Sequence, residues 1–172
     1  MSTITLSNGI KMPFIGLGTW QVKDPEEGIL AVKSAIQSGY KAIDTAVVYQ
    51  NEAAVGEGIK QSGVDREELF ITSKRWVQDM KDYDCAKKAI DASLQKSGLE
   101  YLDLYLLHQA MGDYFSAYRA MEDAYKEGKL KAIGVSNFYP HTLVNFCSFV
   151  EISPMVNQVE LHPVFAQPHA LE

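Results

Sequence analysis

Short apolar runs alternate with longer segments of helical periodicity along almost the whole chain, and this alternation limits the possible folds most strongly. The runs KAIGVS and LDLYLL are apolar without a period of two, as in strands buried on both faces. In contrast, Tyr114, Tyr118 and Met121 recur at helical spacing. Alternating strands and helices form parallel βα units. We predict six strands, at 14–20, 40–44, 69–74, 101–108, 130–136 and 155–161.

Helix-start and helix-stop residues delimit the segments between these strands. Asp24 is a suitable N-cap, Pro25 suits the first helical position, and Gly39 suits the left-handed position after a helix. Before the first strand, Asn8-Gly9 separates two short runs and predicts a hairpin over 3–14 with a type I′ turn. The predicted helices cover 24–39, 51–61, 82–98, 112–128 and 139–150, and another begins within 166–172.

This order of elements predicts an α/β fold of the (β/α)₈ TIM-barrel family with only about six βα units. A closed barrel needs eight units and typically about 250 residues, whereas this chain has 172. We therefore expect residues 1–172 to form a single incomplete barrel domain, truncated at its C-terminal end, with residues 1–14 as a hairpin cap. The first and sixth strands are then expected to be open edges that favour self-association.

Composition argues against several classes of function. A formal net charge of −6 with no basic stripe makes nucleic acids and anionic membranes poor partners. There is no apolar run of 18 residues and no signal-peptide core, so we expect a cytoplasmic protein. Cys85 and Cys147 are too far apart for a metal motif, and the histidines have no ligand spacing with carboxylates or thiols. We predict no metal site.

Four polar residues lie at or just beyond the ends of predicted strands: Asp44, Tyr49, Lys74 and His108. The carboxyl ends of parallel strands meet at one face of a barrel, so these side chains are expected to converge. Hydride addition to a carbonyl builds negative charge on oxygen, which must receive a proton or hydrogen bonds. A phenol made more acidic by Lys74 could donate the proton, while Asp44 holds the lysine and neutral His108 donates a hydrogen bond.

Each of the four residues also has an ordinary structural explanation. Asp44 could cap a turn, Tyr49 could be a half-buried aromatic residue, and Lys74 could extend to the surface. His108 could be a core histidine bonded to the backbone. Their joint occurrence at successive strand ends favours a catalytic site over these separate explanations.

The chain resembles the aldo-keto reductase superfamily in six motifs that occur in the family's order. They are GLGTW, DTAVVYQNEAAVGEGI, FITSKRW, LDLYLLH, GKLKAIGVSNF and NQVELHP. The segment from LYLLH to GVSNF, in which Gln109 stands where many relatives have tryptophan, is similar to the bacterial-type branch that includes 2,5-diketo-gluconate reductases. The resemblance implies an NADPH-dependent oxidoreductase that reduces small aldehydes and ketones to alcohols.

The resemblance also implies a role for each matching residue. Tyr49 would be the general acid, tuned by Lys74 and Asp44, and His108 would orient the carbonyl. The residues expected at the nicotinamide are Gly18, Thr19, Trp20, Asp44, Ser136, Asn137 and Gln158. The residues expected to line the substrate pocket are Trp20, Val48, Trp76 and Gln109.

The chain departs from the family pattern at some positions, and one alternative function stays open. Arg75, Ala110 and Met111 replace a usual leucine, proline and aromatic residue. The family's segments for the pyrophosphate and the 2′-phosphate are absent from the 172 residues, so we expect weak nucleotide binding. The alternative is a truncated, non-catalytic barrel fragment. A full-length relative is expected to be a monomer.

Overall fold

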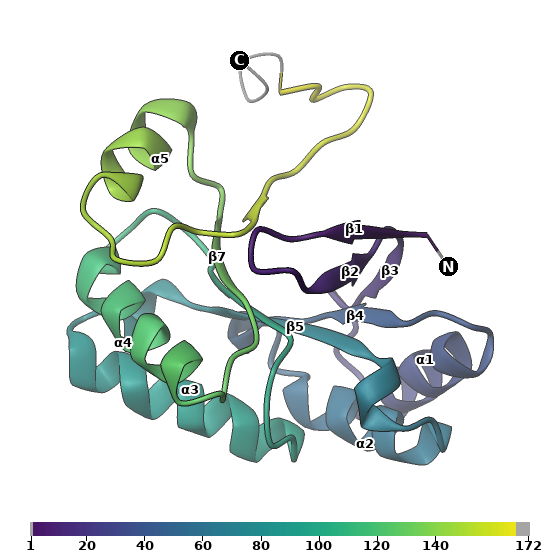
Figure 1. Cartoon of the computed structure of the whole chain (residues 1–172). Coiled ribbons are helices and arrows are strands. Elements are labelled where there is room, and N and C mark those ends of the chain that lie inside the picture. Colours follow the sequence, from purple (N-terminus) through teal and green to yellow (C-terminus); the bar gives the residue numbers. More distant parts are fainter. Residues whose placement is uncertain (1, 168–172) are drawn as a thin grey trace.

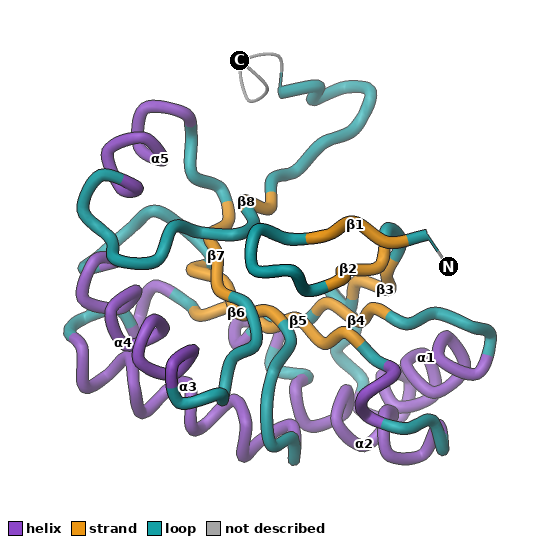
Figure 2. Tube along the Cα trace, in the orientation of Figure 1, coloured by secondary structure: helices purple, strands orange, loops and turns teal. Residues whose placement is uncertain are grey.

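The computed structural model describes residues 2–167, and its α/β architecture agrees with the sequence prediction. A six-stranded parallel sheet has the order β3-β4-β5-β6-β7-β8, and a separate antiparallel pair joins β1 and β2 (Figure 2). The strands are β1 Thr3–Thr5, β2 Lys11–Pro13, β3 Gly16–Gly18, β4 Ala42–Asp44, β5 Phe70–Arg75, β6 Leu104–Leu107, β7 Ile133–Ser136 and β8 Asn157–Gln158. The helices are α1 Pro25–Gln37, α2 Glu52–Ser62, α3 Tyr83–Ser97, α4 Tyr114–Lys126 and α5 Pro140–Cys147, with short helical turns η1 Val47–Tyr49, η2 Arg66–Glu68 and η3 Val77–Asp79.

The sheet curls as part of a barrel, with α1 to α4 along its outer side (Figure 1). Within residues 2–167, β3 pairs only with β4, and β8 pairs only with β7. The open edges expected from six strands in sequence order are therefore confirmed for the described part of the chain. The helix expected within 166–172 falls almost entirely outside the described residues.

Alternate residues of each strand enter two separate cores. Leu104 and Leu106 pack inside the barrel, whereas Tyr105 and Leu107 pack outward against the helices. The inner cluster is closed by the hairpin, whose Leu6 packs against the first residues of the strands. This contact is consistent with the expected role of residues 1–14 as a cap, which stays a prediction.

The predicted type I′ turn in the hairpin is wrong. The loop contains three residues, because Leu6 N donates to Ile10 O at 2.8 Å and Gly9 N donates to Leu6 O at 2.9 Å. Only Gly9 has a positive φ, of 88°, while Asn8 is not among the positive-φ residues. The Asn8 side chain instead accepts from Ile10 N at 3.2 Å and donates to Lys131 O at 2.9 Å, which fixes the hairpin to the barrel.

Helix α1 has the predicted ends. The Asp24 side chain accepts from Glu27 N at 2.9 Å, Pro25 is the first helical residue, and Gly39 has a φ of 99°. Elsewhere the bounds differ: β3, β4, β6, β7 and β8 are all shorter than predicted, and the two edge strands β3 and β8 are proportionally shortened most. Strand β5 extends one residue beyond Lys74 to Arg75, whose side chain is fully buried.

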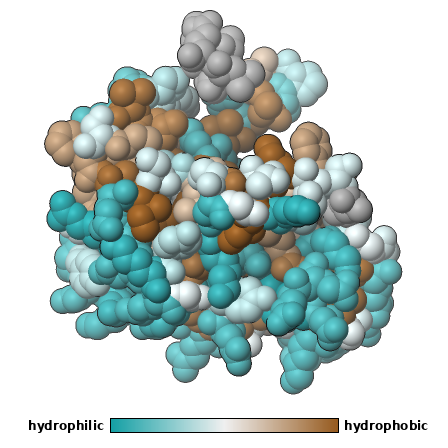
Figure 3. Space-filling model, viewed as in Figure 1, coloured by the Kyte–Doolittle hydropathy of each residue, from teal (hydrophilic) through white to brown (hydrophobic). Residues whose placement is uncertain are grey.

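The outer surface is hydrophilic over the helices below the sheet and apolar around α5 (Figure 3). Val144 and Phe149 are 68% and 69% exposed there. No helix of the described residues is long and apolar enough to cross a membrane.

Candidate active site

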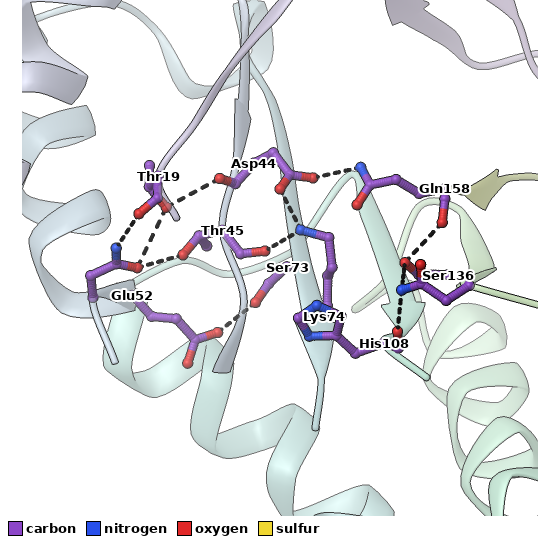
Figure 4. A network of polar contacts seen from close by, with 11 residues as sticks. Thr19, Asp44, Thr45, Glu52, Ser73, Lys74, His108, Ser136 and Gln158 are labelled. Atoms are coloured by element: carbon purple, nitrogen blue, oxygen red, sulfur yellow. Dashed lines mark hydrogen bonds and ion pairs between the residues drawn. The ribbon is translucent and has the colours of Figure 1, made fainter. Parts of the chain in front are cut away.

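Asp44, Lys74 and His108 converge from β4, β5 and the end of β6 (Figure 4). Asp44 is the last residue of β4 and pairs in register with Gly18 and Thr72 on the neighbouring strands. Lys74 lies two positions beyond Thr72, on the same face of the sheet. Parallel register therefore brings the predicted side chains to one end of the barrel.

An ion pair between Asp44 and Lys74 lies at the centre of this site. Lys74 Nζ donates to Asp44 Oδ1 and also to Thr45 O at 3.1 Å, and the lysine is 1% exposed. Burial lowers the pKa of Lys74, and the Asp44 carboxylate opposes this shift. The other oxygen of Asp44 accepts from Gln158 Nε2 at 2.9 Å, so the carboxylate links β4, β5 and β8.

Tyr49 lies on η1, beside the ion pair. Lys74 Nζ is 5.1 Å from the centroid of its ring, and the His108 ring centroid is 5.8 Å away in an edge-on arrangement. Burial, together with the Asp44 charge, raises the pKa of Tyr49 to about 12. Sequence reasoning expected Lys74 to lower this pKa. The net shift in the folded protein is upward, because burial disfavours phenolate and the Asp44 carboxylate adds to this effect, so any lowering by Lys74 is smaller than these two contributions.

His108 is held between two aromatic rings, Tyr49 and Trp76. The Trp76 ring is 5.2 Å from it between centroids, at an interplanar angle of 77°. Burial, and secondly the Lys74 charge, lower the pKa of His108 to about 4, so the imidazole is neutral at pH 7. Within residues 2–167, its buried Nδ1 has no hydrogen-bond partner. A neutral imidazole can donate one hydrogen bond and accept another.

Ser136, Asn137 and Gln158 form a connected polar group at the ends of β7 and β8. Ser136 Oγ donates to Gln158 O at 2.9 Å, and Asn137 Nδ2 donates to Ser136 Oγ at 3.1 Å and to His108 O at 3.0 Å. Asn137 has a φ of 60°, in the left-handed region that asparagine tolerates. Carboxamide and hydroxyl groups both donate and accept, which suits a ligand that carries a primary amide.

The other predicted site residues make fewer hydrogen bonds within the site. Gly18 ends β3, and the buried Thr19 donates through Oγ1 to Asp44 O at 3.1 Å. Trp20 and Val48 are 69% and 37% exposed. Gln109 is half-buried directly after His108. The structure therefore connects Thr19 to the Asp44 segment. Within residues 2–167, Trp20, Val48 and Gln109 make no hydrogen bond to the ion pair.

Sequence reasoning missed the supporting role of Asn51. Its position before α2 is typical of an N-cap, yet its side chain does not cap the helix. The Asn51 amide accepts from Thr45 Oγ1 at 2.7 Å and donates to Thr19 O at 2.8 Å. Asn51 thereby joins the segment after β3 to the residue that directly follows Asp44.

Neither a metal-binding cluster nor the cavity described below coincides with this site within residues 2–167. No group of three or more His, Cys, Asp or Glu side chains within 2–167 could hold a metal ion. A cavity of about 640 Å³ lies between α2 and α3, and its lining, which includes Gly56, Lys60 and Leu99, contains none of the predicted site residues.

Comparison with known proteins gives consistent matches. A model of the aldo/keto reductase family matches residues 14–172. The chain is 52% identical over 168 residues to an uncharacterized oxidoreductase, YtbE, of Bacillus subtilis (95% of this chain, 60% of the relative), and 51% identical over 166 residues to glyoxal reductase of the same organism (96% and 60%). Methylglyoxal reductase DkgA of Escherichia coli is 43% identical over 169 residues (96% and 60%). The chain thus spans about 60% of the length of these curated relatives.

Solved structures show the same fold. An aldo/keto reductase from Brucella melitensis superposes with a TM-score of 0.94 at 39% identity, covering 99% of this chain and 67% of the other. An aldo-keto reductase from Bombyx mori, solved in complex with NADP, superposes with a TM-score of 0.93 at 37% identity, covering 99% and 61%.

Proposed function

Because the chain belongs to the aldo/keto reductase family, we propose that the protein reduces small aldehydes and ketones to alcohols with NADPH, and that Tyr49 donates the proton. The observation that carries the proposal is the placement of Tyr49 between the cation of Lys74 and the neutral ring of His108. General acid catalysis needs a donor within reach of the developing oxyanion, and a second donor stabilises the same charge.

The chain's own residues divide the work at the carbonyl. When bound by the polar group of Ser136, Asn137 and Gln158, NADPH would supply the hydride for the carbonyl carbon. Tyr49 Oη gives its proton to the carbonyl oxygen, and solvent returns a proton to the phenolate. His108, neutral because its pKa is about 4, donates a hydrogen bond to the same oxygen. Asp44 keeps Lys74 charged and in place.

The residues present suit the nicotinamide end of the cofactor. Ser136, Asn137 and Gln158 form the polar group that can pair with a carboxamide, and Thr19 and Asp44 lie on the facing strands. Gln158 also contacts Asp44 directly, at 2.9 Å, so amide recognition and the proton-donating site share a hydrogen bond. We propose this group as the nicotinamide contact, with Gly18 and Trp20 beside it.

Small carbonyl compounds are the proposed substrate class. Two relatives are named glyoxal reductase and methylglyoxal reductase, which supports small aldehydes with a second carbonyl group. Trp20, Val48, Trp76 and Gln109 would line the pocket, and the Trp76 ring packs against His108.

The direct test follows the hydride. The 172-residue protein is incubated with methylglyoxal and NADPH deuterated at the transferred position, and the product alcohol is examined by mass spectrometry. We expect deuterium on the former carbonyl carbon. Saturable NADPH binding without labelled alcohol would contradict the proposed reduction. The absence of both binding and labelled product would contradict it as well and would favour the non-catalytic fragment with impaired nucleotide binding.

A further inference from the structure

Arg75 lies on the opposite face of β5 from Lys74, and its side chain is fully buried. Side chains alternate across a strand, so Lys74 points into the barrel while Arg75 points toward the surrounding helices. We infer that Arg75 is a positioning residue, which holds the loop after β5 so that Trp76 packs against His108.

The guanidinium of Arg75 connects three segments of the chain. One terminal amino group donates to the main-chain carbonyl of Asp79, on η3, and the other donates to Ala86 O, on α3, at 2.5 Å. Both acceptors are backbone oxygens, so the contact depends on the path of the main chain. One side chain thus fixes the end of β5, the loop and the first turns of α3 relative to one another.

Trp76 lies in the short segment between Arg75 and Asp79, whose ends are joined by the hydrogen bond from the Arg75 side chain. The Trp76 carbonyl accepts from Asp79 N at 3.1 Å, so the backbone from 75 to 79 is held both by this turn and by the guanidinium. The Trp76 ring is the side chain that this short loop presents to His108, edge-on at 5.2 Å between centroids. Without the guanidinium, the loop that carries Trp76 would lose its hydrogen bond to α3 and keep its backbone hydrogen bonds.

The loop that follows His108 rests on the same segment. Asp113 N donates to Met80 O at 2.9 Å, and Met80 is buried. A Cβ at Gly112, whose φ is 71°, would lie 3.2 Å from the same carbonyl oxygen. The loops that carry Trp76 and Gln109 therefore form one packed unit, anchored to β5 through Arg75.

The charge of Arg75 has a cost that an apolar residue would not have. Burial lowers the pKa of the guanidinium, and its Nε has no hydrogen-bond partner within residues 2–167. Apolar side chains that replace a buried charge are often neutral or stabilising. A leucine, usual at this position in the family that the sequence resembles, could fill the space but could not donate to Asp79 and Ala86.

The inference rests on the proposed function only in treating Trp76 as a wall of the substrate pocket, so the main test needs neither nucleotide nor substrate. In a Trp20→Phe background, Trp76 is the remaining tryptophan and reports its own exposure by acrylamide quenching. Arg75→Leu should raise the quenching constant about twofold, because a loosened loop exposes the indole. The matched control is Arg119→Leu, on the exposed face of α4, which should leave quenching unchanged.

Hydrogen exchange separates loop positioning from general stability. Loss of the two hydrogen bonds should speed exchange of the Asp79, Met80 and Asp113 amides about tenfold, while the amides of Leu106 and Ile133 keep their protection. Arg75→Gln, which retains one donor group, should give an intermediate effect and serves as the test variant if Arg75→Leu does not fold. In a form with turnover, KM should rise about threefold with kcat within twofold.

Two results would overturn the inference. One is quenching and loop exchange at wild-type values in a folded variant. The other is a uniform increase of exchange across the sheet, which would show that Arg75 contributes to global stability alone. Either result leaves the proposed reduction unaffected, and a failed deuterium transfer leaves the loop measurements intact.

Discussion

Asp44 links three other residues of the site. Its side chain accepts from Lys74 and Gln158, and its carbonyl accepts from Thr19. The same carboxylate raises the pKa of Tyr49. Burial, and secondly the Asp44 charge, therefore keep the Tyr49 phenol protonated.

We predict opposite effects on Tyr49 from the two members of the ion pair. Asp44→Asn should lower the Tyr49 pKa below about 12, because a nearby negative charge disfavours phenolate. Lys74→Met should raise it further, since the Asp44 charge is then unpaired, and should strongly reduce activity. Ultraviolet difference titration, with Tyr49→Phe subtracted, measures both shifts.

The control for this titration is Asp91→Asn, which removes an exposed carboxylate of α3. It should leave the Tyr49 titration unchanged. Equal titration curves for wild type, Asp44→Asn and Lys74→Met would show that the ion pair does not tune the phenol.

His108 should make folding stability depend on pH. Its pKa is about 4 in the folded protein and 6.5 as the reference for the unfolded chain. Between these values the unfolded state binds more protons, so the free energy of unfolding increases with pH. This contribution is fully present above pH 6.5 and is lost as the pH falls through about 4. Urea unfolding of His108→Gln should show a smaller decrease across this window than wild type, and parallel curves would contradict the assignment.

At the scale of single elements, the close approach of β8 to β7 depends on a glycine. An ideal Cβ at Gly134 would lie 2.4 Å from Val156 O and 2.9 Å from a methyl carbon of Leu106. Val156 O also accepts from Val135 N at 2.9 Å, which joins the two strands. Strand β8 carries Gln158, so this approach also sets the position of Gln158 relative to Asp44.

Gly134→Ala should therefore destabilise the protein by about 1–3 kcal/mol, the usual range for overpacking. Gly18→Ala is the matched strand control for stability, because a Cβ there meets nothing within 4 Å. Urea denaturation of both variants gives the comparison. Equal free energies of unfolding for Gly134→Ala and Gly18→Ala would contradict the prediction, because they would show that the close approach of β7 and β8 does not require glycine.

Sequence patterns predicted the order and type of these elements because short runs such as LDLYLL and KAIGVS alternate with segments of helical periodicity. They failed where a contact depends on distant backbone. The Asn8 side chain bonds to Lys131 O, and Asn51 bonds to Thr19 O instead of capping α2. The predicted strand ended at Lys74, whereas β5 includes Arg75. The hydrogen bonds of Arg75 to carbonyls on η3 and α3 depend on tertiary packing, which a sequence pattern does not show.

The four expected site residues were identified because strand ends converge in parallel folds, which is a property of topology. Their ionisation was less predictable. A sequence shows that a lysine is near a tyrosine in the fold, but the sign of the Tyr49 shift depends on burial and on which group pairs with Lys74.

For the whole molecule, the sheet edges of the 172-residue chain predict self-association. Within residues 2–167, β3 and β8 each lack a second partner, and Ile15, directly before β3, is 58% exposed. Unpaired strand edges invite pairing with another chain. Sedimentation equilibrium should show species heavier than the 19.2 kDa monomer.

Ile15→Lys should weaken this association, because charge beside an edge strand opposes pairing. Leu30→Lys, an equally exposed apolar position on α1, is the matched control and should not change it. A monodisperse monomer of the unmodified chain would contradict the prediction.

The central claim is that Tyr49 donates the proton in NADPH-dependent carbonyl reduction. The most direct measurement compares the rate of aldehyde reduction by Tyr49→Phe and Tyr40→Phe, with NADPH binding measured on the same samples. Tyr40 precedes β4, at the opposite end of that strand from Asp44. The account predicts a loss of about 10²–10⁴-fold for Tyr49→Phe alone, with nucleotide binding retained. Activity of Tyr49→Phe within about threefold of wild type would contradict it, since general acid catalysis is worth far more.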